Sequence, residues 1–156
     1  MHMKERKEVL FVSFALIILI GVLNIWALNN FWYWVYWWFD ILMHFLGGLW
    51  VGVMAIWVYY LSGLLGKPLI TKKNVLILSF VSVLVVGIGW EVFEIFIKET
   101  INEPGFIIDT LGDLLFDLLG AFVAYRYFTY HFLENKHELF AYIKEYRKCI
   151  DYLFRV

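Results

Sequence analysis

The sequence has few charged residues and a single cysteine, and each shortage excludes some classes of function. Only 17% of its 156 residues are charged and the net charge is -1, so no nucleic acid or other polyanionic partner is implied. The single cysteine, Cys149, excludes an internal disulfide and a cysteine-rich metal site. Apolar residues make up 63% of the chain, more than a fold this small can hide from water. The class predicted is therefore integral membrane protein.

The signatures of several membrane enzymes are also missing. The sequence has no G-x-S-x-G nucleophile region of a rhomboid-type serine protease and no glycine-rich loop that cradles a phosphate. The TLGD at 110–113 has threonine where intramembrane aspartyl proteases have glycine. The basic and histidine motifs of lipid-phosphate phosphatases and the Asp-Gly and Ala-Arg elements of CDP-alcohol phosphotransferases are absent too. None of these reactions is supported.

Four apolar segments are long enough to cross a bilayer as helices. They cover about residues 9–28, 36–61, 75–97 and 106–127. A basic start precedes the first, as in a cleaved signal peptide, but no small-x-small cleavage site follows, so a retained span is expected. The fold predicted is all-α: an integral membrane bundle of four transmembrane helices.

Basic residues gather on one side of this bundle. They precede the first span, lie between the second and third, and end the fourth: Lys4, Arg6, Lys7, Lys67, Lys72, Lys73 and Arg126. The segment between the first two spans has neither lysine nor arginine. The positive-inside rule then places both termini of this multi-pass cell-membrane protein in the cytoplasm. The aromatic run FWYWVYWWF at 31–39 fits a belt at the outer interface.

The predicted domain division falls between 128 and 129. Residues 1–128 form the four-helix transmembrane domain. After Tyr127, apolar residues recur at helical spacing, with charged residues between them. Residues 129–156 are therefore expected to form a cytoplasmic amphipathic helix that lies on the lipid bilayer or packs on a second subunit. The sequence leaves open whether the chain forms a homo-oligomer.

Ionisable side chains converge in the outer half of the last three spans. Asp40 and His44 are one helical turn apart, and Glu91 and Glu94 are three residues apart. The stretch DTLGDLLFDLLG adds an acid at every fourth position: Asp109, Asp113 and Asp117. No lysine or arginine lies within this layer. Because each charge in a span costs at least a few kcal/mol, either a cation occupies the layer or several acids stay protonated.

Carboxylates with one imidazole suit a divalent cation such as Zn, Mg, Mn or Fe. The predicted core ligands are His44, Glu91 and Asp113, with Asp40 or Glu94 completing the set. Asp117 and Asp109 are the candidate catalytic carboxylates, Asp117 as general base on a metal-bound water. A structural alternative is open for Asp40 and Asp109, which could cap helix N-termini. Five glycines are expected to let the helices approach closely around the ion: Gly47, Gly48, Gly87, Gly89 and Gly112.

These residues also carry a family resemblance. D-x3-H-x2-G-G from Asp40, W-E-x2-E from Trp90 and D-T-x2-D-x3-D-x2-G from Asp109 occur in this order. The set resembles the small membrane proteins typified by YjdF and is more distantly similar to the VanZ-like group. It spans about residues 39–125. The VanZ-like resemblance implies a cell-envelope role, although Asp117 stands where those proteins typically have asparagine.

Two functions follow from this pattern. The first is a metal-dependent membrane hydrolase acting on a lipid or lipid-linked envelope substrate. The second is a proton- or cation-coupled transporter or channel subunit that uses the aspartates of the fourth span as a ladder. Below Asp117 that span offers only LLGAFVAY, which favours a one-sided site over a through-path. A non-catalytic accessory protein is the third alternative.

Overall fold

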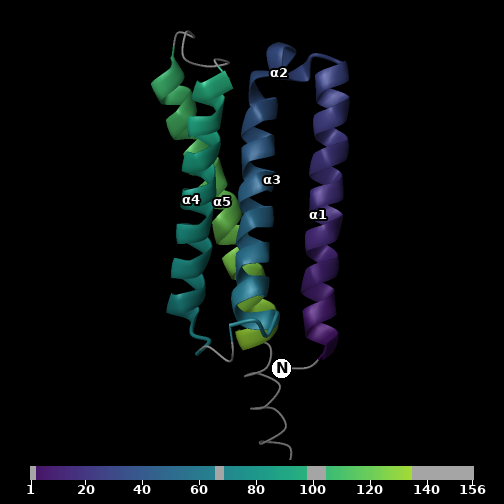
Figure 1. The fold of residues 1–156 in the computed structure, drawn as a ribbon, viewed down its shortest axis with the longest axis vertical. Coiled ribbons are helices and arrows are strands. Elements are labelled where there is room, and N and C mark those ends of the chain that lie inside the picture. Colours follow the sequence, from purple (N-terminus) through teal and green to yellow (C-terminus); the bar gives the residue numbers. More distant parts are fainter. Residues whose placement is uncertain (1–2, 66–68, 98–104, 135–156) are drawn as a thin grey trace, which may run out of the picture. The chain divides into compact units, whose positions relative to one another are not determined.

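The computed structural model describes residues 3–65, 69–97 and 105–134, and every regular element among them is helical (Figure 1). Four helices are long: α1 (Met3–Asn29), α3 (Trp37–Ile56), α4 (Lys72–Ile97) and α5 (Phe106–Thr129). The chain divides into two compact units, Met1–Tyr125 and Arg126–Val156. The all-α prediction is confirmed for the described residues.

Within the described residues, three helical segments are long and apolar enough to cross a membrane: Arg6–Asn29, Trp37–Leu61 and Lys72–Phe96. They coincide with the first three predicted spans within a few residues. Helix α5 has 24 residues, or about 36 Å of helix, which is also long enough. Its aspartates make it too polar to qualify on composition, so the fourth span and the direction of the chain across the membrane stay predictions.

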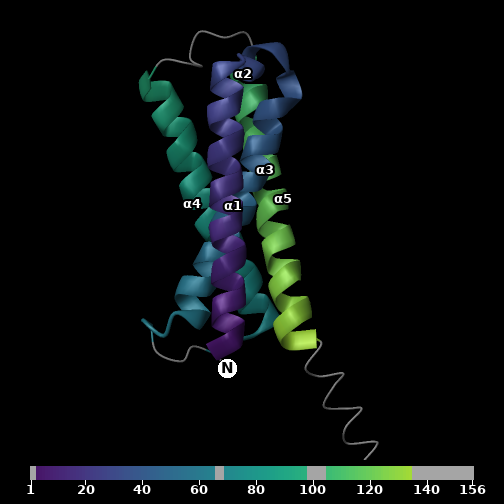
Figure 2. The same ribbon diagram turned by 90° about the vertical axis from the view of Figure 1, so that its right-hand side faces the viewer.

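Within the first unit, α3 lies centrally and contacts both α1 and α4 (Figures 1 and 2). Helix α5 approaches α3 so closely that backbone meets backbone. A Cβ added at Gly120 would overlap the carbonyl oxygen of Phe45. One turn further on, a Cβ added at Gly52 would lie 2.8 Å from the Cβ of Ala124. Small residues thus bring the two helices together, as is common where helices pack in a membrane.

The glycine expectations hold in part. Gly48 and Gly87 both lie against Asp117, so their predicted role in close approach is confirmed. Gly47, Gly89 and Gly112 have no other described part of the chain within 4 Å of an added Cβ, so for them the prediction is wrong. The physical reason is that neighbouring positions on a helix face different directions, and only one face touches a partner.

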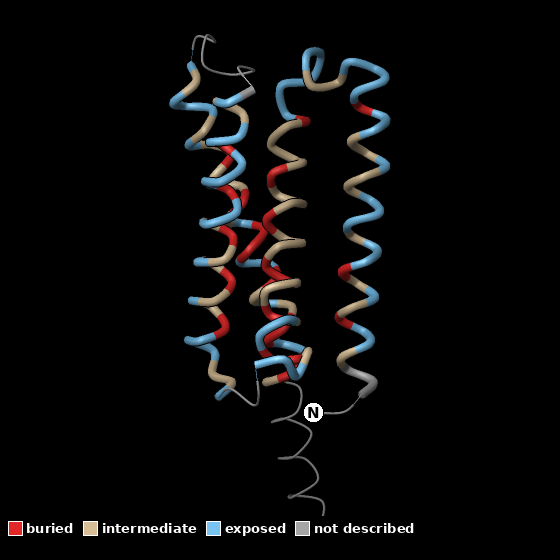
Figure 3. Tube along the Cα trace, viewed as in Figure 1, coloured by how far each residue is buried: buried red, intermediate tan, exposed pale blue. Residues whose placement is uncertain are grey.

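Buried positions follow the faces that α3, α4 and α5 turn toward one another (Figure 3). Ser79 of α4 is fully buried there and donates a 2.9 Å hydrogen bond to the carbonyl of Ala121 on α5. Large apolar side chains instead cover the outer surface, with Phe11, Val85 and Ile108 among the most exposed. Apolar outer faces around a polar interior suit a lipid environment.

One end of the unit is held by aromatic rings. Phe31 adopts a left-handed conformation (φ 58°) and turns the chain from α1 into the one-turn helix α2 (Trp32–Val35). Trp32 stacks on Trp26 of α1 and meets the buried Phe39 edge-on, with centroids 5.7 and 5.4 Å apart. Such pairs contribute about 0.5–1.5 kcal/mol each. The predicted aromatic run therefore also ties α1 to α3.

At its other end, α3 continues into the π-helical turn η1 (Trp57–Leu61). The indole of Trp57 donates a 3.0 Å hydrogen bond to the carbonyl of Arg6, and the Arg6 guanidinium bonds the carbonyl of Ser62. Both contacts fix α1 to the end of α3.

The second unit is described only as far as residue 134. The last turn of α5 passes into the π-helical turn η2 (Tyr130–Glu134), where Arg126 pairs with Glu134 at 3.7 Å and Phe128 stacks on Phe132. Most of the predicted amphipathic helix, together with Cys149, lies outside the described residues. The division at 128 stays a prediction.

Candidate metal site

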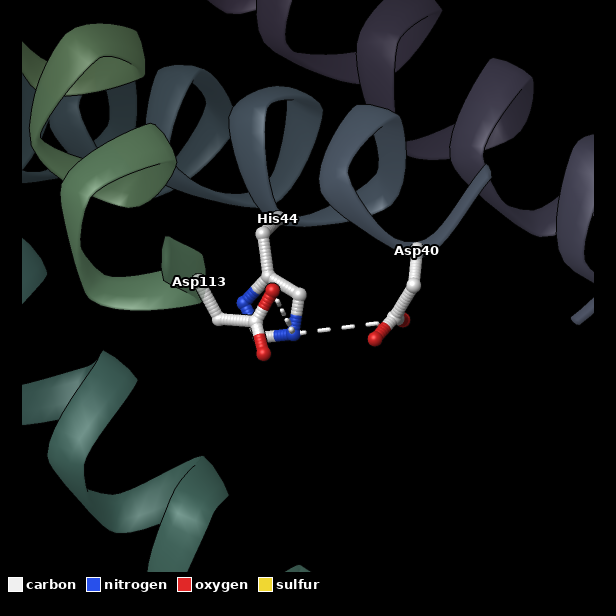
Figure 4. Close-up of side chains that lie close together, drawn as sticks. All are labelled: Asp40, His44 and Asp113. Atoms are coloured by element: carbon white, nitrogen blue, oxygen red, sulfur yellow. Dashed lines mark ion pairs between the residues drawn. The ribbon is translucent and has the colours of Figure 1, made fainter. Parts of the chain in front are cut away.

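The site is centred on His44, which is buried on α3. Its Nε2 lies 4.0 Å from Oδ1 of Asp40, one turn earlier on the same helix, and 3.9 Å from Oδ1 of Asp113 on α5 (Figure 4). Asp113 is buried and Asp40 is partly exposed. Two helices far apart in sequence thus bring an imidazole and two carboxylates together.

These three residues could hold a metal ion. Each offers one ligand atom, and all three atoms lie within 4.8 Å of one another. An ion bound at about 2.0–2.4 Å from each ligand separates any two of them by no more than about 4–5 Å. One imidazole with two carboxylates fits Zn, Mn or Fe, and Mg if water completes the shell.

The other ring nitrogen of His44 faces a different carboxylate. Its Nδ1 lies 3.6 Å from Oδ2 of Asp117, one turn beyond Asp113 on α5. Asp117 is 6% exposed. A Cβ added at Gly87 on α4 would overlap its Oδ2, and one at Gly48 on α3 would overlap its backbone carbonyl. The two glycines therefore leave a notch that Asp117 fills.

Glu91 lies buried beside this group on α4. It is 6% exposed, and its Oε1 has no hydrogen-bond partner in the part of the chain that the structure describes. Thr110 lies within hydrogen-bonding reach of the carboxylate, and the charge of Glu91 interacts with those of His44 and Asp117. An unpaired oxygen at this depth costs about 1–3 kcal/mol, so it points to a missing partner such as a water or an ion.

The remaining two predicted residues lie away from the ligand group. Glu94 is half-buried and accepts a 2.7 Å hydrogen bond from the indole of Trp90. Asp109 is exposed in the first turn of α5, where a carboxylate favours the helix N-terminus. Neither belongs to the three residues whose ligand atoms converge.

Sequence reasoning did not identify Tyr33. This residue of α2 donates a 2.8 Å hydrogen bond to Asn24 of α1 and packs edge-on against Phe39 at 5.1 Å. Burial and the nearby carboxylates of Asp40 and Glu94 raise the pKa of Tyr33 to about 12. The hydroxyl therefore lies near the carboxylates as a neutral donor. It stands in a run of nine residues of which eight are aromatic, so nothing in the sequence separated it from the interfacial belt.

The family model described as "Predicted membrane protein (DUF2238)" matches residues 1–134, and the chain belongs to this family. The match covers every residue of the site and confirms the prediction of a membrane protein. No curated protein and no solved structure matches the chain significantly.

Proposed function

We propose that this member of the DUF2238 family binds a divalent cation between α3 and α5 and uses it to hydrolyse a lipid or lipid-linked envelope substrate. The observation that carries the proposal is the convergence of Asp40, His44 and Asp113, whose ligand atoms lie within 4.8 Å of one another. Function at this group is supported by the cost of placing ionisable side chains within a membrane, which makes such residues candidates for a functional site.

Helix α5 acts as a fourth span in this proposal. Its acids Asp113 and Asp117 are buried, whereas the opposite face exposes a continuous apolar stripe. That stripe consists of Ile107, Ile108, Leu111, Leu115, Leu119 and Phe122. A polar inner face and an apolar outer face are what a helix in lipid needs when it lines a polar site.

The chemical roles follow from position. The ion, held by Asp40, His44 and Asp113, would supply a Lewis acid and an activated water. Glu91 is the best-placed general base, because its Oε1 is free of hydrogen bonds within the described residues and lies outside the ligand group. Water adds to the ester carbon or phosphorus and its proton passes to Glu91. The ester C–O or P–O bond then breaks, and Glu91 returns the proton to the departing alcohol. Glu94 and Asp109 are on this view accessory to the reaction.

In this proposal the site lies in the outer half of the membrane and both termini are cytoplasmic, which the distribution of basic segments supports. The YjdF-like and more distant VanZ-like resemblances agree with a site facing the cell envelope. The partly exposed Asp40 would be the ligand closest to an entering substrate, since His44 and Asp113 are buried behind it.

The test uses the protein in liposomes that contain lipid esters and lipid-linked phosphates. We expect release of product that stops with a chelator and returns with one divalent cation. The Glu91→Gln variant should lose about a hundredfold to ten-thousandfold of this rate, the usual contribution of a general base. Cation-independent turnover, or none in any lipid mixture, would contradict the hydrolase.

The alternative is transport along the aspartates of α5. It has less support, because the next buried positions of α5 after Asp117 are the small apolar Gly120, Ala121 and Ala124, with Phe128 and Thr129 beyond them. The buried hydroxyls of Ser79 and Thr129 each donate a hydrogen bond to a backbone carbonyl, Ser79 to Ala121 and Thr129 to Arg126. Proton or cation flux that vanishes in Asp117→Asn, without lipid turnover, would favour transport.

A further inference from the structure

We infer that Asp117 is a positioning residue, which holds the Nδ1 side of His44 so that Nε2 faces Asp40 and Asp113 as a metal ligand. This assignment replaces the predicted role of Asp117 as general base, and it rests on the proposed function for the identity of the ligand. The orientation of the His44 ring is inferred from geometry alone and does not depend on the proposed function.

The two nitrogens of His44 face different carboxylates. Nε2 lies 3.9 and 4.0 Å from the carboxylates of Asp113 and Asp40, whereas Nδ1 lies 3.6 Å from that of Asp117. A neutral imidazole carries one proton, so the nitrogen that donates determines which one is left to bind. A proton held on Nδ1, beside the carboxylate of Asp117, leaves the Nε2 lone pair directed at the converging ligand atoms.

Asp117 is held more firmly than an ordinary side chain. It is buried, it fills the notch left by Gly87 on α4, and its backbone lies directly against Gly48 on α3. A carboxylate held by two neighbouring helices can fix the ring that it contacts. Ligating histidines commonly donate their second N–H to such a carboxylate, which orients the ring and raises its basicity.

A separate observation supports ligand binding by the side chains around His44. Glu91 is 6% exposed, yet its Oε1 has no hydrogen-bond partner among the described residues. Its charge interacts with those of His44 and Asp117, so the unpaired oxygen belongs to the same cluster. Asp113 and Asp117, one turn apart, then have different roles: Asp113 binds the ion and Asp117 orients the histidine.

The first arm of the test titrates the full-length protein with Co²⁺. We expect wild type to bind one ion and Asp117→Asn to bind one ion about 10–100-fold more weakly, the usual effect of removing an orienting carboxylate. Asp113→Asn should lose stoichiometric binding. Glu8→Gln, which removes an exposed carboxylate at the start of α1, is the matched control and should bind as wild type does. Wild-type affinity in Asp117→Asn, or complete loss as in Asp113→Asn, would overturn the assignment.

The second arm needs no metal. In ¹⁵N-histidine-labelled protein, the His44 signal is identified by its loss in His44→Gln. We expect the neutral ring to carry its proton on Nδ1 in wild type and to lose this preference in Asp117→Ala. A wild-type ring protonated on Nε2 would overturn the assignment. If wild type binds no Co²⁺ but keeps the Nδ1 proton, the metal-dependent function fails while the positioning by Asp117 stands.

Discussion

Gly48 on α3 lies directly against the backbone of Asp117 on α5, so closely that a Cβ at position 48 would overlap the carbonyl oxygen of Asp117. The contact is between backbone atoms, so no side-chain rotation can relieve it. It fixes the distance between the helix that carries His44 and the helix that carries Asp113. The packing of the bundle and the geometry of the site therefore depend on the same glycine.

Gly48→Ala should destabilise the protein by about 1–3 kcal/mol, because an added methyl group must push two backbones apart. Thermal unfolding in detergent measures the effect. The adjacent Gly47→Ala is the matched control: nothing described lies within 4 Å of its added Cβ, and alanine gains up to about 1 kcal/mol of helix propensity. Equal melting temperatures for the two variants would contradict this account of the helix contact.

Glu91→Gln should stabilise the metal-free protein by about 1–3 kcal/mol, because an amide costs less to bury than a carboxylate with an unpaired oxygen. Denaturation in the presence of a chelator tests this. Glu94→Gln provides the comparison and should change stability little, since Glu94 is half-buried and its bond from Trp90 can be kept. A metal-free Glu91→Gln protein that melts below wild type would show that the carboxylate is already satisfied.

Stability should fall between pH 10 and about pH 12, partly through Tyr33. Burial, then Asp40 and Glu94, raise the pKa of Tyr33 from 10.0 to about 12 in the folded protein. Because the folded state keeps this proton where the unfolded state has lost it, its contribution is complete below pH 10 and vanishes as pH rises through 12. Wild type should therefore lose melting temperature more steeply than Tyr33→Phe over this window.

Tyr36→Phe, at an exposed tyrosine of the same segment, is the control and should follow wild type. At neutral pH Tyr33→Phe should cost about 0.5–1.5 kcal/mol, the contribution of its hydrogen bond to Asn24. Parallel alkaline profiles for wild type and Tyr33→Phe would refute this placement of the hydroxyl.

The proposed topology can be tested with single cysteines in a Cys149→Ser background. An impermeant thiol reagent added to intact cells should label Asn30→Cys but not Lys73→Cys, because the proposed topology assigns position 30 to an outer turn and position 73 to a basic inner segment. Leu115→Cys, on the apolar stripe of α5, should resist labelling from both sides. Reversed labelling at 30 and 73 would show the opposite orientation. Free labelling at 115 would contradict the fourth span.

Length and apolar content predicted the long helices well, because a bilayer requires uninterrupted helix of a known length. Three of the four expected spans are apolar enough to stand on composition alone. The fourth is not, because it carries three acids within its apolar stretch: Asp109, Asp113 and Asp117. The exposed apolar stripe of α5 adds a second indication of a span to its length, and that stripe becomes visible only when burial is known.

The convergence of His44 with Asp113 followed from depth along the spans, but the roles of the other acids did not. A residue eight positions away on a helix is rotated by about 80°, so Asp109 and Asp117 do not face the same way. Asp117 is buried and Asp109 is exposed. Which ring nitrogen of His44 meets which carboxylate depends on the rotation of α5 against α3, and no spacing in the sequence records that rotation.

The most direct measurement of the central claim is elemental analysis of purified wild type, His44→Ala, Asp113→Asn and the control Glu8→Gln. The account predicts about one divalent cation per chain in wild type and Glu8→Gln, and loss of that ion in both site variants while they remain folded. A folded wild type with negligible metal, or site variants that keep the ion, would contradict it.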